Sequence, residues 1–350
     1  MNDRLEIFHS QFPTAYYFDE YHLEDLPKYL LNKGLISPGE KIMSISKPGE
    51  GNMNFVQRII TERQSFIIKQ SRPWVEKYPQ LEAPVERLEV EAKYYQFISR
   101  DSFFREYSPD VILYDPENLI IVTEDLGKSS DFTFCYKKSK KIHDNQLVSL
   151  LNYISYLHNK NWANSKIEFP SNQALKQLNH EHIFTYPYKL ENGFDLDTIQ
   201  IGLQEISLPI KHDSKLKEKI SALGKKYLDS GPVLIHGDYY PGSWLVVKNQ
   251  VKVIDPEFAF FGFAEFDLGV MVANLLMAGI TKNEIEKLLP NYKKRSDFDW
   301  DLFLGFCGTE MLRRIIGLAQ LPLELTLLEK KELIDLSLEF INSPESHQFL

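Results

Sequence analysis

The chain has 350 residues, 43% of them hydrophobic and 25% charged, a composition typical of a globular protein with room for two domains. Its formal net charge of -9 argues against sequence-independent binding to nucleic acid or to anionic membranes. Two cysteines, Cys135 and Cys307, are too few for a disulfide framework and indicate free thiols in a reducing compartment.

The sequence predicts no targeting segment and no membrane segment. The N-terminal MNDRLEIFHSQF has early acids and lacks the apolar stretch of a signal peptide. No apolar run approaches the roughly 18 residues that a membrane-spanning helix needs. We therefore expect a cytoplasmic protein with a small-molecule partner, no nucleic-acid partner and no membrane partner; a homodimer is compatible with the sequence.

The first part of the chain predicts mostly strands. Residues 18–34 are expected to be helical, and residues 40–70 read as three strands joined by turns, the last strand being SFIIKQ. Apolar residues at helical spacing predict a helix over 84–100, and DVILYD and NLIIVTEDLG are two more candidate strands. Residues 1–126 are therefore expected to form a small lobe with an antiparallel sheet, and the fold class is α+β.

The remainder, residues 127–350, is predicted to form a larger and mainly helical lobe. Residues 128–141 are polar and basic and read as a solvated loop. The segment DNQLVSLLNYISYLHNK is expected to be a helix with Asp144 as its N-cap and His158 as a core histidine. SWLVVKNQVKVIDPE reads as two strands with KNQ as a hairpin turn, and helices follow from residue 265 onward.

The stretch VLIHGDYYPGSWLV places a polar loop between two apolar runs. Phosphoryl transfer from ATP requires an acid at the acceptor hydroxyl, a cation at the phosphates and further acids that hold Mg²⁺. His236, Gly237 and Asp238 fit the kinase pattern H-R-D-x-x-x-x-N, with Ser243 at the asparagine position. Asp238 is thus the candidate catalytic base, although HGD alone also fits an ordinary turn.

A second acidic motif, IDPE, follows one hairpin later. Asp255 ends a predicted strand, and Glu257 adds a second carboxylate. Mg²⁺ is usually bound by one or two protein carboxylates, with phosphates and waters completing its shell. We predict Asp255 and Glu257 as metal ligands, with Ser243 as a third candidate. Asp-Pro-Glu alone also fits a turn, but the ordered succession of HGD and IDPE favours a kinase-like fold.

Upstream segments supply candidate nucleotide contacts. The turn KPGEGNMNF could cover the phosphates, although a plain hairpin is the more common cause of such a turn. Its candidate residues are Gly49, Gly51, Asn52 and Asn54. Lys69 ends the strand SFIIKQ and resembles the lysine of the V-A-I-K signature, but it also fits an exposed lysine on an edge strand.

Two further candidates concern the partner of Lys69 and the adenine. Glu91 lies beside the apolar face of the next helix and is the predicted partner of Lys69, with Glu89 as its rival. The segment IVTEDLG lies at the predicted junction of the lobes, where kinases bind adenine through backbone groups. There the candidates are Glu124 and Leu126.

From about residue 49 to residue 319, the sequence resembles the aminoglycoside phosphotransferase-like small-molecule kinases, and within them the methylthioribose kinases. The segments that carry the resemblance are GNMNFV, KQ, EDL, HGD with the following GS, IDPEFAF and RRIIGLA. The resemblance implies a two-lobed, protein-kinase-like fold with ATP between the lobes. It also implies Mg²⁺-dependent transfer of the γ-phosphoryl group to a sugar hydroxyl, which in the family is that of 5-methylthioribose.

The resemblance further implies a role for individual residues. Asp238 would be the base, Lys69 would contact the phosphates, and Asp255 and Glu257 would hold the metal. Arg313 and Arg314, from RRIIGLA, would help to form the substrate site; without the resemblance, cations at a helix C-terminus are explained by the helix dipole.

The loop after HGD departs from these relatives and leaves the acceptor open. Methylthioribose kinases usually read Leu-His-Thr-Gly-Ser there, whereas this chain has Tyr239, Tyr240 and Pro241 before its Gly-Ser. We take Tyr239 and Tyr240 as candidate substrate contacts. The alternatives are a kinase for another sugar, for a choline-like amino alcohol or for an aminoglycoside, and a non-catalytic ATP-binding pseudokinase. A metal-dependent hydrolase built on His236 and Asp238 lacks further histidines at ligand spacing.

Overall fold

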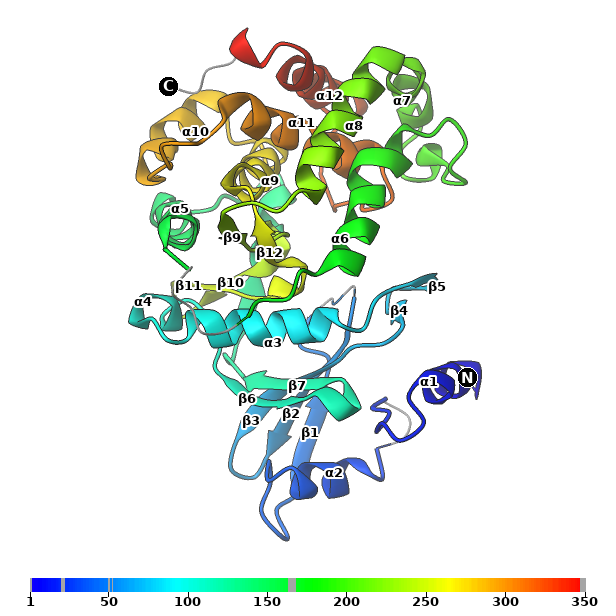
Figure 1. The fold of residues 1–350 in the computed structure, drawn as a ribbon, viewed down its shortest axis with the longest axis vertical. Coiled ribbons are helices and arrows are strands. Elements are labelled where there is room, and N and C mark those ends of the chain that lie inside the picture. The colour runs from blue at the N-terminus through cyan, green and yellow to red at the C-terminus, as the bar shows by residue number, and fades with distance from the viewer. Residues whose placement is uncertain (1, 20–22, 50, 52, 163–167, 347–350) are drawn as a thin grey trace. The chain divides into compact units, whose positions relative to one another are not determined.

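The computed structural model describes residues 2–19, 23–49, 51, 53–162 and 168–346 (Figure 1). The chain divides into two compact units, Met1–Lys128 and Ser129–Leu350. Within the described residues, no helix is both long enough and apolar enough to cross a membrane.

The N-terminal unit is built on one antiparallel sheet with the strand order β1-β2-β3-β7-β6. The sheet strands are β1 (Ile42–Ser46), β2 (Phe55–Thr61), β3 (Ser65–Gln70), β6 (Val111–Asp115) and β7 (Ile120–Glu124). The other elements are α1 (Asn2–Gln11), α2 (Leu26–Asn32), β4 (Trp74–Val75), β5 (Tyr78–Glu82), α3 (Arg87–Ile98) and α4 (Ser102–Arg105). One core lies between α2 and the sheet, where Leu30 packs with Ile59, Ile68 and Val122. The three strands predicted over 40–70 and the helix predicted over 84–100 are therefore present.

The leading segment differs from the prediction in two ways. The helix expected over 18–34 is confined to α2, with Pro27 in its first turn, where a proline is well tolerated. An unpredicted helix, α1, precedes it and buries Phe8 in a small cluster with Ala15 and Trp74. Only one side chain of α1 is buried among those described, so its apolar periodicity is too weak to predict a helix.

The C-terminal unit is mainly helical, as the sequence predicts. Its α-helices are α5 (Asp144–Asn159), α6 (Gln173–His180), α7 (Leu203–His212), α8 (Ser214–Leu228), α9 (Ala264–Met277), α10 (Lys282–Leu288), α11 (Trp300–Ile316) and α12 (Leu327–Asn342). Two short sheets complete the unit: β9 (Val233–Ile235) pairs with β12 (Phe260–Gly262), and β10 (Trp244–Val247) lies between β8 (Ser129–Asp131) and β11 (Gln250–Val253). Every residue of α9 is buried, and α9 packs against α11, so these two helices form the centre of the unit.

The polar segment 128–141 is not the solvated loop that its composition suggests. It contributes β8 and a 3-10 helix, Phe132–Tyr136, which buries Phe132, Cys135 and Tyr136. The sequence interpretation gave too much weight to the lysines and too little to these apolar side chains.

Two smaller predictions for this unit had different outcomes: the N-cap of α5 was predicted one residue too late, whereas the KNQ hairpin turn is present. The N-cap of α5 is His143, and the predicted cap Asp144 is the first helical residue. The β10–β11 turn has positive φ at Lys248 and Asn249, which is the backbone of a tight two-residue hairpin.

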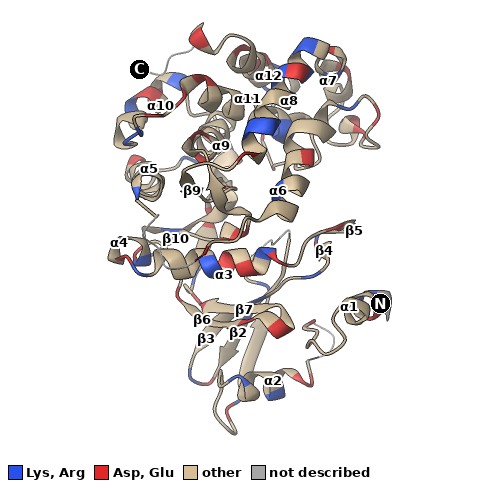
Figure 2. Ribbon diagram, viewed as in Figure 1, with Lys and Arg blue, Asp and Glu red and all other residues tan. Residues whose placement is uncertain are grey.

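Acidic and basic residues are interspersed along α3 and α10 (Figure 2). On α10, the Lys282 ammonium lies 3.9 Å from the Glu286 carboxylate. Exposed pairs of this kind contribute little to stability, and they mark solvated helix faces.

Candidate active site

The loop after β9 is held in one conformation by a glycine and a buried acid. Gly237 has φ of +81°, and a Cβ at this position would overlap the carbonyl oxygen of Phe258. The backbone N–H groups of His236 and Gly237 donate to the two carboxylate oxygens of Asp267, at 2.7 and 2.9 Å. The HGD motif therefore forms a loop of defined conformation, in which position 237 requires a glycine.

Asp267 is the residue that sequence reasoning missed. It lies in α9, is fully buried, and also accepts a hydrogen bond from Nε2 of His158 at 3.1 Å. His158 contacts the Tyr292 hydroxyl through Nδ1 and is a core histidine, as predicted. A lone acid inside the apolar stretch FDLGVMVANLLM was the available signal, because an acid in a buried helix needs donors.

Asp238 retains solvent access, with 23% of its side chain exposed. Its Oδ1 lies 3.4 Å from a terminal nitrogen of Arg314 and 3.6 Å from one of Arg313. Burial raises the pKa of Asp238, and the two guanidinium groups oppose this rise. The arginines implied by the resemblance therefore do lie at the predicted base. Arg313 also donates to Oδ1 of Asn179 at 3.1 Å.

His236 has a structural position in the loop. It is fully buried, and its Nε2 donates to the carbonyl oxygen of Ile254 at 3.0 Å. Burial lowers the pKa of His236, which favours the neutral ring.

The two tyrosines of the loop have different surroundings, and the prediction for Tyr239 was wrong. Tyr239 is fully buried, donates its hydroxyl to the Leu150 carbonyl at 2.9 Å and stacks on Tyr153 with 6.0 Å between ring centroids. It is a core residue and cannot contact a substrate. Tyr240 is half-buried, and the Arg314 guanidinium lies 4.6 Å from the centroid of its ring.

Ser243 closes the loop onto itself. Its hydroxyl donates to the Asp238 carbonyl at 2.8 Å, and its backbone N–H donates to the Tyr240 carbonyl, also at 2.8 Å. At the neighbouring Gly242, a Cβ would overlap the Tyr240 ring. These contacts fix Asp238 and Tyr240 relative to each other, and the role of Ser243 as a metal ligand stays a prediction.

Asp255 and Glu257 follow β11. Asp255 has φ of +61°, a left-handed conformation that is uncommon outside glycine and concentrates at functional sites. Glu257 is buried, and its carbonyl accepts from Nδ2 of Asn172 at 2.8 Å. Burial raises the pKa of Tyr240, and the charges of Asp238 and, to a lesser degree, Asp255 raise it further. The carboxylates of Asp238 and Asp255 therefore lie near the Tyr240 ring.

These acids fit the demands of Mg²⁺ and not those of a metal held by protein side chains alone. Within the described ranges, no group of three or more His, Cys, Asp or Glu side chains is placed to hold a metal. Mg²⁺ needs only one or two carboxylates when phosphates and waters complete its octahedron.

In the N-terminal unit, Lys69 and Glu91 form a buried ion pair of 2.7 Å. Lys69 lies on β3, which is an inner strand paired with β2 and β7, so the alternative of an exposed edge-strand lysine is excluded. Glu91 is fully buried on α3, whereas its rival Glu89 is exposed.

The turn between β1 and β2 gives less support to the predicted phosphate cover. Asn54 is buried, and its side-chain oxygen accepts from Nε of the buried Arg87 at 2.9 Å, so this oxygen is engaged within the unit. Gly49 has an ordinary φ, and a Cβ added to it would meet no atom within 4 Å; at Gly51 a Cβ would make only ordinary contacts. Asn52 lies outside the described residues.

The segment after β7 is tied to the sheet by Arg58. Its guanidinium donates to the Asp125 carboxylate at 3.1 Å and to the Gly127 carbonyl at 3.0 Å. The Glu124 side chain is exposed, and Leu126 is half-buried. The backbones of Glu124 and Leu126 thus lie in an ordered segment, and the contact of these residues with adenine stays a prediction.

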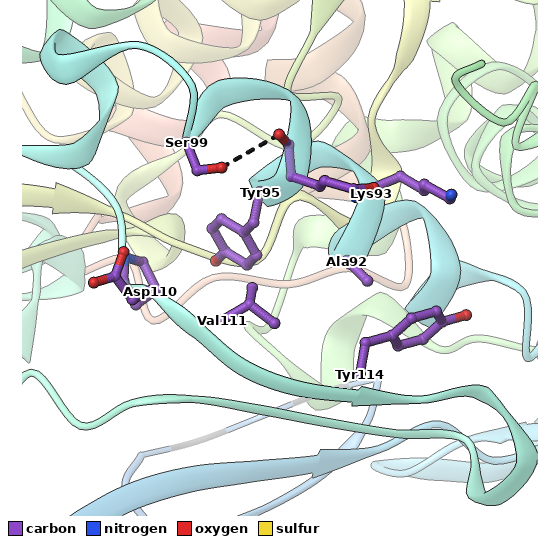
Figure 3. Close-up of a pocket in the computed structure, with 9 residues that line it drawn as sticks. Ala92, Lys93, Tyr95, Ser99, Asp110, Val111 and Tyr114 are labelled. Atoms are coloured by element: carbon purple, nitrogen blue, oxygen red, sulfur yellow. Dashed lines mark hydrogen bonds between the residues drawn. The ribbon is translucent and has the colours of Figure 1, made fainter. Parts of the chain in front are cut away.

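A separate cavity of about 610 Å³ lies between α3 and the start of β6 (Figure 3). The close-up shows Tyr95 and Val111 facing each other across it, with Tyr114 farther along. None of the predicted site residues lines this cavity.

Comparison with known proteins agrees with this geometry. Residues 187–305 match the phosphotransferase enzyme family. The chain is 26% identical to the methylthioribose kinase of Pectobacterium atrosepticum, over 85% of each chain. It is 28% identical to that of Bacillus mycoides, over 77% of this chain and 78% of the relative.

Solved structures show the same fold. A choline kinase from Streptococcus pneumoniae aligns over 92% of this chain and 99% of its own, with a TM-score of 0.53 and 14% identity. A choline/ethanolamine kinase family protein from Mesorhizobium loti aligns over 91% and 96%, with a TM-score of 0.50 and 14% identity.

The match to the phosphotransferase enzyme family and the relatives named methylthioribose kinase indicate a small-molecule kinase, which is a phosphotransferase, and the solved structures show its kinase-like α+β fold. The resemblance to the aminoglycoside phosphotransferase-like kinases, and to methylthioribose kinases in particular, is confirmed.

Proposed function

We propose that this kinase transfers the γ-phosphoryl group of ATP to a hydroxyl of a neutral, sugar-like acceptor, with 5-methylthioribose as the first candidate. The observation that carries the proposal is Asp238, held by a rigid loop and facing two guanidinium groups while part of its side chain stays exposed. The relatives named methylthioribose kinase support the choice of acceptor.

In the proposed reaction, the acceptor oxygen attacks the γ-phosphorus of ATP. The bond from that phosphorus to the bridging oxygen breaks, ADP leaves, and the hydroxyl proton passes to Asp238. A raised pKa suits this role, because a base whose pKa lies closer to neutral accepts a proton more readily. Positioning and charge neutralisation provide most of the rate enhancement in such a transfer.

Lys69 would neutralise charge on the ATP phosphates, and its pairing with Glu91 fixes the direction of its ammonium. Asp255 and Glu257 would hold Mg²⁺, together with the phosphates. When bound, Mg²⁺ supplies further neutralisation of phosphate charge. The left-handed backbone of Asp255 and the burial of Glu257 restrict the conformations that these two residues can adopt.

The charge around Asp238 favours a neutral acceptor over a cationic one. Two guanidinium groups lie within 3.6 Å of the base, and a cationic amino alcohol or aminoglycoside bound there would face both. Asp238 and Glu310 balance the charge of the two arginines, so the cluster offers no excess negative charge to a cationic acceptor. The choline kinases among the solved structures share the fold and do not bear on the acceptor.

An ATP-consumption screen tests the proposal. The acceptors are 5-methylthioribose, other sugars, choline and an aminoglycoside, each tried with the wild-type chain and with Asp238→Asn. We expect turnover with methylthioribose or another neutral sugar, and a loss of about 10²- to 10⁴-fold in kcat for the variant with unchanged ATP affinity. Phosphorylation of choline or an aminoglycoside alone would disprove the neutral acceptor, and ATP binding with no acceptor consumed would identify a pseudokinase.

A further inference from the structure

Glu310 joins the two arginines of α11. Consecutive residues of a helix point about 100° apart, so Arg313 and Arg314 have no intrinsic reason to converge. Glu310 lies three and four residues before them. Its Oε1 accepts a hydrogen bond from Nε of Arg314 at 2.7 Å, and its Oε2 lies 2.8 Å from Nε of Arg313 in an ion pair without hydrogen-bond geometry. One carboxylate therefore draws both guanidinium groups to the same side of the helix.

The arginines are held more closely by Glu310 than by Asp238. Their separations from Asp238 are 3.6 and 3.4 Å, both to Oδ1. Charge-assisted hydrogen bonds of arginine to carboxylate are shorter, about 2.7–2.9 Å. Asp238 is thus close to both cations, and the hydrogen bond that it accepts from Arg314 is long, at 3.4 Å.

A buried chain of hydrogen bonds supports Glu310 from behind. Nδ2 of Asn274, on α9, donates to Oε1 of Glu310 at 3.3 Å. The Tyr136 hydroxyl donates to Oδ1 of Asn274 at 2.6 Å. All three side chains are at most 3% exposed, so this chain leads from the 3-10 helix Phe132–Tyr136 through α9 to α11 within the core.

We propose that Glu310 is a positioning residue, which holds the two guanidinium groups off Asp238 and so keeps the base available to the acceptor hydroxyl. This proposal rests on the proposed role of Asp238. The cluster contains two cations and two anions. If Glu310 loses its charge, both arginines have one carboxylate left. Arg314 is the nearer and already donates to Asp238 at 3.4 Å, so its guanidinium closes on Asp238 in a bidentate pair. The base is then occupied before the acceptor arrives.

The first test is a crystal structure of Glu310→Gln, which needs no turnover. We expect the closest Arg314–Asp238 contact to shorten from 3.4 Å to about 2.8 Å, the length of a charge-assisted hydrogen bond. Retention of the wild-type separation would overturn the proposal. If the wild-type chain phosphorylates no acceptor, the proposed function fails, and this distance still decides the role of Glu310.

The second test is a kinetic cycle of Glu310→Gln with Arg314→Gln. The single change at Glu310 is expected to lower kcat about 100-fold without changing the KM for ATP, a loss on the scale of one proton-transfer group. Removing Arg314 as well removes the cation that closes on the base, so the double variant is expected to recover kcat about tenfold over Glu310→Gln. Losses that multiply instead would show that Glu310 does not act through Arg314.

A milder pair of variants covers the case in which Glu310→Gln does not fold. Tyr136→Phe removes the hydroxyl that orients Asn274, and we expect kcat to fall about three- to tenfold, as for one lost buried hydrogen bond. Tyr188→Phe is the matched control. Its hydroxyl is buried near Glu310 and Arg313 and makes no hydrogen bond within the described residues, so kcat should not change. Equal effects of the two changes would contradict the proposal.

Discussion

Gly237 shows how one residue fixes the geometry of the catalytic loop. Its left-handed backbone turns the chain between His236 and Asp238, and the Phe258 carbonyl occupies the space of a side chain. The turn leaves both N–H groups of residues 236 and 237 directed to Asp267. The position of Asp238 is thus set by backbone contacts of the two residues before it.

Gly237→Ala is expected to lower stability by more than the roughly 1–2 kcal/mol that a left-handed backbone costs an ordinary residue, because the overlap with Phe258 adds to it. Urea unfolding of the variant measures this loss. Gly49→Ala is the control, since Gly49 has an ordinary φ and open space around it; its change should stay within about 0.5 kcal/mol. Equal losses at the two positions would refute this account of Gly237.

The same loop shows the limit of sequence reasoning at single residues. The spacing of HGD and IDPE predicted Asp238 and Asp255, because a motif constrains order along the chain. It could not separate Tyr239 from Tyr240, since the irregular loop backbone decides which ring enters the core. Asp267 lies far along the chain in an apolar helix, and only the folded loop shows that it accepts from His236.

At the scale of elements, the pair of Lys69 and Glu91 links β3 to α3. Lys69 is 8% exposed and Glu91 is fully buried, so the ion pair compensates two charges that are largely removed from water. A helix that carries the acid and an inner strand that carries the lysine are both fixed by apolar packing. The ion pair then orients the ammonium without deciding the fold.

Glu91→Gln is expected to destabilise the chain by about 3–5 kcal/mol and to raise the KM for ATP, because it removes the carboxylate that pairs with a buried lysine. Thermal unfolding and ATP kinetics measure the two effects. Glu89→Gln, an exposed change on the same helix, should alter neither. If the two variants behave alike, the ion pair has no role in orienting Lys69.

The first turn of α12 carries a pH-dependent cap. Thr326 and Glu329 form a capping box, and Lys138 contacts the Glu329 carboxylate at 2.6 Å. The Lys138 hydrogen bond, followed by the bonds to Thr326, lowers the pKa of Glu329 to about 2. A lowered pKa means that the folded state favours the charged form, so its contribution is complete above the ordinary value and is lost as pH falls toward 2.

We therefore expect Glu329→Gln to lower the Tm at pH 7, and the difference from wild type to shrink as the pH falls from about 4.5 toward 2. Thermal scans across this range measure it. Glu332→Gln is the control, because Glu332 is exposed on the same helix and makes no ion pair within the described residues. A difference that stays constant with pH would exclude the ionised carboxylate as its source.

Elements were predicted well where periodicity was strong. The strands around the KNQ turn and the helix α5 follow from alternating and helical apolar patterns. The segment 128–141 was misread, because a short buried 3-10 helix has no period long enough to outweigh its lysines. The segment 18–34 was predicted too long, since its helix begins only at Leu26.

At the scale of the whole molecule, the residues of the proposed chemistry are divided between the two units of the chain. Lys69 and Glu91 lie in Met1–Lys128, whereas Asp238, Asp255 and Glu257 lie in Ser129–Leu350. The α+β class and the kinase-like fold were predictable because the motifs occur in a fixed order on elements of fixed type. The side-chain network behind Arg313 and Arg314 was not, since it joins three segments that are distant in sequence.

Ligand linkage tests the proposed nucleotide and metal sites on the intact chain. ATP with Mg²⁺ at about 100 times its dissociation constant should stabilise the native state by about 2.7 kcal/mol, which appears as a rise in Tm. Chelation of Mg²⁺ should remove most of this rise, because unshielded phosphates repel Asp255 and Glu257. In Asp255→Asn, the Mg²⁺-dependent part of the rise should be largely lost, while the Tm without ligand serves as the control for folding. An ATP-induced rise that is the same with and without Mg²⁺ would show that these two acids do not bind the metal of the nucleotide.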